Sequence, residues 1–144
     1  MRVLIADDHP LIRSAMKLLL ESDGHEVVAE ADNGADAVQL ARKHNVDLII
    51  LDITMPGLDG LEVINRIRAS EVKSRILVVT SQSPLFYSQR SMKAGAAGFI
   101  TKGQDLTELM RAVKVIMDGY TFFPFLAASS VRNSDTSMSD IELI

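Results

Sequence analysis

Five short apolar runs alternate with helical segments along this chain of 144 residues, and this alternation constrains the fold more than any other feature. An uninterrupted apolar run such as Leu48–Leu51 is typical of a strand that is covered on both faces. Strands that alternate with single helices at this spacing form right-handed βαβ units. We therefore expect an α/β protein with a doubly wound, five-stranded parallel sheet. The expected strands are Val3–Ala6, Val27–Ala29, Val46–Leu51, Ile76–Val79 and Ala96–Ile100.

The helical segments between these runs differ in how clearly they are patterned. The last one, Leu106–Met117, repeats apolar residues at helical spacing and is closed by Gly119. Ser83–Lys93 is the weakest expected helix, because it holds three serines and no continuous apolar stripe. The other expected helices run from Pro10 to about Ser22, from the turn at Asn33-Gly34 to about His44, and from near Asp59-Gly60 to about Ala69-Ser70.

Composition excludes several classes of protein. With 47% hydrophobic residues the chain can bury the core of one domain, and without cysteine it has no disulfide framework and no thiolate metal site. A net charge of −4 argues against a nucleic-acid binder, which usually shows a basic face. No apolar run approaches the roughly 20 residues of a membrane span, and the start is too short and too soon acidic for a signal peptide. We expect a soluble cytoplasmic protein without membrane contact.

Three carboxylates follow two of the expected strands. Asp7 and Asp8 come directly after the first strand, and Asp52 comes directly after the third. If these strands are parallel neighbours, the carboxylates converge at the edge where open α/β sheets place their sites. Like charges raise each other's pKa unless a cation neutralises them, and a carboxylate cluster suits Mg²⁺. The simpler alternative is that these acids only cap helix N-termini.

Two further polar residues follow the remaining strands. Thr80 comes after the fourth strand and Lys102 after the fifth. A hydroxyl and an ammonium are suitable partners for phosphoryl oxygens, and a carboxylate such as Asp52 can act as the nucleophile that forms an aspartyl-phosphate. His9 is in reach of such a group, although its simplest role is to cap the first helix.

These residues together resemble the receiver domain of bacterial two-component response regulators, which has the CheY-like (βα)5 fold. The resemblance covers residues 1 to about 120 and rests on several spaced motifs. The Asp-Asp-His-Pro start and the Gly-Ala-Ala-Gly-Phe run resemble more particularly the NarL/LuxR-type branch. The matching segments are Asp7-Asp8, Leu51–Gly60, Thr80-Ser81 and Gly95–Lys102.

The resemblance assigns roles to the acids. It implies that Asp52 is the phosphoacceptor. It also implies that Mg²⁺ is held by Asp7, Asp8, Asp52 and the backbone carbonyl of Thr54. An aspartyl-nucleophile phosphohydrolase is an alternative class of protein. Such enzymes carry an Asp-x-Asp motif, and here Thr54 stands where the second Asp would be. A flavodoxin-like FMN protein is another, but Asp7 and Asp8 would repel its phosphate.

The resemblance also implies a switch. Thr80 would be the switch hydroxyl, Lys102 the cation that contacts phosphate, and Phe99 the aromatic switch. Two of these positions depart from the common pattern. Phe99 replaces the commoner Tyr, so it can be buried or exposed without leaving a hydroxyl unpaired. Gly103 replaces the Pro that often follows the lysine, which should loosen the loop.

The implied partner is a sensor histidine kinase or phosphotransfer protein, and the domain takes part in its own Mg²⁺-dependent phosphotransfer and autodephosphorylation without being an enzyme in the usual sense. We expect the receiver at residues 1–120 and a linker at 121–144, with Asn133–Ser139 polar and mobile. The segment Met138–Ile144 resembles the start of a LuxR-type helix-turn-helix DNA-binding domain, with Ile141 where Arg is usual. The alternative is a stand-alone phosphotransfer or protein-interaction receiver without DNA output.

A homodimer is also expected, because a two-fold regulator reads paired half-sites. Two surfaces compete. The face of the fourth helix and fifth strand is the one that the switch would move, but Ser83–Lys93 offers little apolar anchor. The last helix carries more apolar positions than one core-facing stripe requires, so we favour a contact between the first and last helices. An aromatic cluster that includes Phe122 and Phe123 follows the last helix. If these rings fold back over the apolar excess, the domain would stay a monomer.

Overall fold

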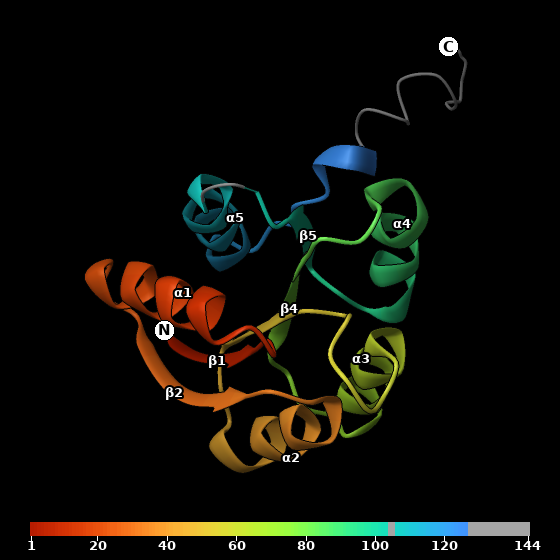
Figure 1. The fold of residues 1–144 in the computed structure, drawn as a ribbon, viewed down its shortest axis with the longest axis horizontal. Coiled ribbons are helices and arrows are strands. Elements are labelled where there is room, and N and C mark those ends of the chain that lie inside the picture. Colours follow the sequence, from red (N-terminus) through yellow and green to blue (C-terminus); the bar gives the residue numbers. More distant parts are fainter. Residues whose placement is uncertain (104–105, 127–144) are drawn as a thin grey trace.

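In the computed structural model, residues 1–103 and 106–126 are described, and they form one parallel sheet with helices on both faces (Figure 1). The strand order is β2-β1-β3-β4-β5, and every pairing is parallel. The expected fold class is therefore confirmed. The strands are β1 (Arg2–Ala6), β2 (Glu26–Ala31), β3 (Leu48–Leu51), β4 (Arg75–Thr80) and β5 (Gly98–Thr101).

All five expected helices are present, including the weakly patterned fourth one. Their ends follow the local capping chemistry: Asn33 caps α2 by accepting a hydrogen bond from the Asp36 amide, and α4 ends at Gly95 in the left-handed conformation. Because the amide of Ala96 bonds back to Ser91 in α4, β5 begins at Gly98 rather than at Ala96. The helices are α1 (Pro10–Ser22), α2 (Gly34–His44), α3 (Gly60–Ala69), α4 (Pro84–Ala94) and α5 (Thr107–Met117).

The sheet separates two cores. Helices α1 and α5 cover one face, and α2, α3 and α4 cover the other (Figure 1). Strand β3 contributes Leu48 and Ile50 to the first core and Ile49 and Leu51 to the second, and all four are fully buried. This explains why the strand has no polar face in the sequence.

The chain after α5 returns to the edge of the sheet. Phe122 pairs with Gly98 of β5, accepting a hydrogen bond from the Phe99 amide at 2.9 Å and donating one to the Ala97 carbonyl at 2.9 Å. The ring of Phe125 packs edge-on against Phe99 with 6.3 Å between centroids. The aromatic cluster therefore folds back onto the domain.

The polar segment Asn133–Ser139 and the expected helix-turn-helix start Met138–Ile144 lie outside the described residues. Within residues 1–103 and 106–126, no helix has the length and hydrophobicity that a bilayer crossing requires.

Candidate functional site

The central pair of strands determines where the site lies. Ala6 of β1 is the register partner of Leu51 of β3, so Asp7 and Asp52, the next residues, emerge side by side at the carboxyl edge of the sheet. The chain runs from β1 outward to β2 and then back to β3 on the other side, and such a reversal of strand order is where doubly wound sheets bind ligands. The predicted convergence of these carboxylates is therefore present.

Backbone hydrogen bonds continue the sheet through both acids. The Asp52 amide donates to the Ala6 carbonyl at 2.9 Å, and the Asp7 amide donates to the Ala31 carbonyl at 3.0 Å. Both side chains are at most 1% exposed. The two carboxylates are consequently held by the rigid core rather than by a loop.

Asp52 accepts a full set of hydrogen bonds. Its Oδ1 accepts from the Thr54 amide at 2.9 Å, from the Thr54 hydroxyl at 2.7 Å and from the Thr80 hydroxyl at 2.9 Å. Its Oδ2 accepts from Lys102 Nζ at 2.6 Å. These four donors all stabilise negative charge at this carboxylate.

Lys102 directly follows the edge strand β5 and reaches the acids from there. Its amide donates to the Thr80 carbonyl at 2.8 Å, which fixes the backbone beyond β5. Its Nζ lies 2.6 Å from Asp52 Oδ2 and 2.9 Å from Asp7 Oδ2, with the side chain 9% exposed. One ammonium thus neutralises part of the charge of two buried carboxylates.

The pKa of Asp52 reflects two opposed effects. Burial alone raises the pKa of the carboxyl, but the hydrogen bonds from Lys102 and Thr54 and the charge of Lys102 outweigh burial, so the pKa of Asp52 lies below its ordinary value. Burial alone would lower the pKa of Lys102, yet its close contacts with the carboxylates of Asp52 and Asp7, and their charges, raise it. Both groups are therefore charged at neutral pH, as a nucleophilic carboxylate and a phosphate-binding cation require.

The loop after Asp52 is pressed against α3. Asp59 caps this helix by accepting a hydrogen bond from the Leu61 amide at 2.9 Å. A Cβ on Gly60 would lie only 2.3 Å from the Cα of Ile53, so no side chain larger than hydrogen fits there without moving the loop. Gly60 therefore allows the segment that carries Asp52 to pack closely on the helix start.

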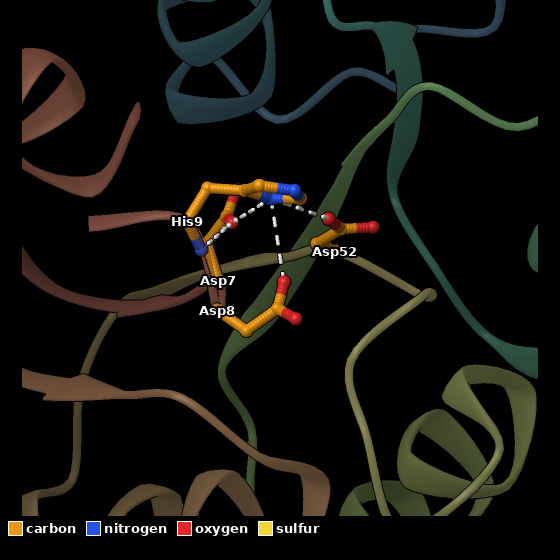
Figure 2. A group of neighbouring side chains, drawn as sticks. All are labelled: Asp7, Asp8, His9 and Asp52. Carbon is orange, nitrogen blue, oxygen red and sulfur yellow. Dashed lines mark hydrogen bonds and ion pairs between the residues drawn. The ribbon is translucent and has the colours of Figure 1, made fainter. Parts of the chain in front are cut away.

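The acids also form a cluster suited to a divalent cation. Ligand atoms of Asp7, Asp8, His9 and Asp52 lie within 4.8 Å of one another (Figure 2). Asp7 Oδ2 and Asp8 Oδ1 are buried and have no hydrogen-bond partner of regular geometry among the described residues, although Lys102 Nζ lies 2.9 Å from the first and His9 Nδ1 3.3 Å from the second. One Lys102 ammonium against three carboxylates formally leaves two negative charges unmatched. The oxygen-rich donor set and this charge fit Mg²⁺.

Most residues predicted for the site come together. Asp7, Asp8, Asp52, Thr80 and Lys102 converge at the carboxyl edge of the sheet. The Thr54 amide and hydroxyl both bind Asp52, a contact that sequence reasoning missed, whereas the role of its carbonyl as a metal ligand stays a prediction.

Phe99 is fully buried in the core under α2, α3 and α4, and the Thr80 hydroxyl is turned toward Asp52. Both proposed switch residues thus point inward.

The expected capping role of His9 is wrong. His9 occupies the N-cap position of α1, but its side chain makes no capping hydrogen bond. The ring instead turns over the acids, with Nδ1 3.0 Å from Asp7 Oδ1 (Figure 2). The available signal was its position directly after two strand-end carboxylates.

This fold and this pocket define a doubly wound α/β protein with an acidic site at the carboxyl ends of its central strands. The chain belongs to the response regulator receiver domain family, which matches residues 3–114. It is 45% identical over 143 residues to the virulence-factor transcription regulator BvgA of Bordetella pertussis (strain Tohama I), covering 99% of this chain and 68% of BvgA. It is 39% identical to the Fimbriae Z protein of Salmonella typhimurium (strain LT2), covering 93% of this chain and 64% of that protein.

A solved structure of the same family has a similar fold. The crystal structure of a LuxR-family two-component response regulator from Aurantimonas sp. SI85-9A1 matches with a TM-score of 0.82 at 33% identity, covering 90% of this chain and 94% of that one. The chain is thus a receiver domain of a transcriptional response regulator. Receiver domains of this family bind Mg²⁺ at an acidic pocket, and such regulators partner with histidine kinases and carry DNA-binding domains. The chain spans only about two thirds of the length of either relative.

Proposed function

We propose that this receiver is a phosphorylation-controlled switch in which Asp52 accepts a phosphoryl group from a sensor histidine kinase or phosphotransfer protein. The observation that carries the proposal is the environment of Asp52: a buried carboxylate at a strand end, beside two more acids and bonded to Thr80 and Lys102. The low pKa of Asp52 keeps it a carboxylate at neutral pH.

The transfer itself is a displacement at phosphorus. An oxygen of Asp52 forms the new P–O bond in line with the P–N bond of the donor phosphohistidine, and the electron pair of that bond leaves with the imidazole. Lys102 and Thr80 offer an ammonium and a hydroxyl to the phosphoryl oxygens. Mg²⁺ held by Asp7, Asp8, Asp52 and the Thr54 carbonyl neutralises charge on those oxygens when bound. Hydrolysis of the aspartyl-phosphate at the same site resets the switch.

The output follows from where these residues lie. Once Asp52 carries a phosphoryl group, Thr80 and Lys102 exchange their bonds to the carboxylate for bonds to the phosphoryl oxygens. Thr80 ends β4 and Phe99 lies in β5, so a shift in either alters the face made by α4 and β5. We propose that this face controls a helix-turn-helix DNA-binding domain in a longer protein. A stand-alone phosphotransfer role is the alternative.

Intact-mass analysis tests the phosphoacceptor. The protein is incubated with acetyl phosphate and Mg²⁺, and the wild type should gain the mass of one phosphoryl group. Asp52→Ala should gain none. Asp47→Ala is the matched control, because Asp47 is an exposed carboxylate just before the same strand and should leave the mass gain intact. A phosphoryl gain in Asp52→Ala would refute the assignment. Excess chelator should prevent the gain in the wild type.

We also propose that a second copy of the chain covers the groove between α1 and α5. This groove measures about 500 Å³, and Leu18 in its lining is 72% exposed. Neither Phe122 nor Phe125 lines this groove: Phe122 packs on the core beneath α5 beside β5, and Phe125 packs on Phe99. The groove is lined by Ile12, Ala15, Leu18, Leu19, Gly103, Leu106, Thr107 and Met110.

Sedimentation velocity separates dimer from monomer. An interface of about −5 to −6 kcal/mol should be half occupied near 100 μM. Leu18→Ser should shift the protein toward monomer, whereas Leu85→Ser, at a leucine of α4 that is even more exposed, should not. A wild-type monomer at that concentration, with and without a phosphoryl mimic, would exclude this contact.

A further inference from the structure

The chain that follows α5 is attached to the edge strand β5 by its backbone. The Phe99 amide donates to the Phe122 carbonyl, and the Phe122 amide donates to the Ala97 carbonyl, both at 2.9 Å. Gly98 lies between these two bonds, and a Cβ there would come within 3.1 Å of the Phe122 carbonyl oxygen. The glycine therefore lets the two backbones approach closely.

The aromatic rings of residues 121–126, called the linker segment below, pack on both faces of the sheet. Phe122 packs on the core under α1 and α5, whereas Phe123 and Phe125 pack on the core under α2, α3 and α4. The linker segment, blue in Figure 1, thus passes from the side of α5 to the side of α4 and covers the edge of β5. All three rings are only half-buried, so its attachment is less complete than that of a core element.

These contacts meet at Phe99. Its side chain is fully buried, and the ring of Phe125 stands edge-on to its ring with 6.3 Å between centroids. Its amide makes one of the two backbone bonds to Phe122. A turn of Phe99 out of the core would therefore remove the ring partner of Phe125, and a shift of the β5 backbone would break the bond to Phe122.

The other end of β5 is tied to the acidic pocket. Thr101 is the register partner of Thr80, and the Lys102 amide donates to the Thr80 carbonyl at 2.8 Å. The Thr80 hydroxyl and the Lys102 ammonium both donate to Asp52. Since β5 has only four residues, a change at Asp52 and a change in the linker segment act on the same short strand.

We propose that docking of the linker segment on β5 and phosphorylation of Asp52 favour each other, with Phe125 as the positioning residue that couples them through Phe99. In the structure Thr80 turns toward Asp52, Phe99 is buried and the linker segment is docked. A phosphoryl group offers Thr80 and Lys102 more highly charged oxygens, so it stabilises this position of the strand ends. Because docking needs the same position of β5, each event should strengthen the other by the same factor.

The inference rests on the proposed function and extends it. The face made by α4 and β5 need not carry the signal alone, because the linker segment provides a covalent route from β5 into the chain beyond residue 126.

Hydrogen exchange of the full chain, with and without beryllofluoride as a phosphoryl mimic in the presence of Mg²⁺, tests the coupling. Exchange at the Phe99 and Phe122 amides should slow by about two- to tenfold when the mimic binds, the range that one edge-to-face ring pair contributes to an equilibrium. Phe125→Ala should weaken mimic binding, followed by NMR titration, by a similar factor. Tyr120→Ala is the matched control, because this ring is 67% exposed just before the segment, and it should change neither readout.

A double-mutant cycle separates the coupling from local packing. Phe99→Leu keeps an apolar side chain in the core but removes the ring partner. Phe99→Leu and Phe125→Ala should each speed exchange at the Phe122 amide, and the double variant should do so by less than the product of the two single effects. Effects that multiply, or unchanged mimic binding in Phe125→Ala, would overturn the role of Phe125.

Failure of this inference looks different from failure of the proposed function. If Asp52 gains the phosphoryl mass while the mimic leaves exchange at the Phe122 amide unchanged, the proposed function stands and the coupling is wrong. If Asp52 gains no phosphoryl mass, the proposed function fails, and the coupling fails with it even where the cycle shows that Phe99 and Phe125 interact.

Discussion

Helices α4 and α5 flank the same edge strand, β5, from opposite faces of the sheet, but they are attached in different ways (Figure 1). The fully buried positions of α4 are Ser88 and Ser91, and neither hydroxyl has a hydrogen-bond partner among the described residues. Those of α5 are all apolar: Leu109, Ala112, Val113 and Ile116.

The two attachments differ in free energy. Burying an aliphatic side chain of this size stabilises by about 1.5–3 kcal/mol, whereas burying an unbonded hydroxyl costs about 1–3 kcal/mol. The outer face of α4 carries further apolar residues, with Leu85 91% and Phe86 49% exposed. Helix α4 packs on its core only through half-buried apolar side chains such as Tyr87 and Ala94, so it is held less strongly than α5.

This difference matches the roles of the two sides of the sheet. Elements that move in a switch come from the weakly held part of a fold, because their displacement must cost little. Phe99 packs in the same core as α4, and Thr80 ends the strand next to β5. The proposed phosphorylation signal therefore reaches the side that is weakly attached.

The largest expected effect on stability comes from a substitution in the buried face of α5. Ile116→Ala should destabilise the protein by about 2–5 kcal/mol, because it leaves a cavity in a fully packed core. Urea denaturation measures the change. Met117→Ala, the next residue and 45% exposed, should cost about 1 kcal/mol or less. Similar losses in the two variants would show that α5 is not fixed by its buried face.

A medium effect is expected where β5 meets the acidic pocket. Lys102→Met should destabilise by about 1–3 kcal/mol at neutral pH, because it leaves buried carboxylates without their cation. Lys93→Met, at an exposed position in α4, is the control and should have almost no effect. An equal loss in both variants would mean that the pocket does not help to fix β5.

The stability lost in Lys102→Met should depend on pH in a defined direction. The raised pKa of Lys102 means that its contribution is complete below the unfolded value of about 10.4 and is lost as pH rises through the folded value. The lowered pKa of Asp52 means that its contribution is complete above about 3.9 and is lost as pH falls through the folded value. The difference in free energy of unfolding between the wild type and Lys102→Met should therefore be largest from about pH 5 to 9 and become smaller at lower and at higher pH.

The smallest expected effect on stability comes from the buried serines of α4, and here the substitutions should stabilise rather than destabilise the protein. Ser88→Ala and Ser91→Ala should each stabilise by about 0.5–1 kcal/mol, since a methyl group replaces an unbonded buried hydroxyl and Ala favours the helix. Native-state hydrogen exchange should then show α4 amides better protected, closer to those of α5. Ser22→Ala, which removes an exposed hydroxyl bonded to Leu19, should not stabilise. Destabilisation by either α4 variant would contradict the comparison.

The strand ends of the site could be predicted from the sequence with good accuracy. Asp7, Asp52, Thr80 and Lys102 each follow an apolar run, and parallel strands bring their carboxyl ends to one edge. Ser83–Lys93 was the weakest expected helix, and α4 forms there. Its weak pattern did not reveal that two of its serines face the core, because a helix without an apolar stripe gives no signal for which side is buried.

The sequence by itself therefore determined the order of strands and helices, the two-sided burial of β3 and the set of polar residues at the sheet edge. These features depend on local periodicity and on turns, which a few neighbouring residues decide. Only the tertiary structure decided that His9 turns over the acids and that Phe122 pairs with β5. Both depend on partners distant in the chain, since His9 meets Lys102 93 residues later and Phe122 bonds to Ala97 and Phe99. Such contacts form only after the sheet and the last helix have brought those partners together.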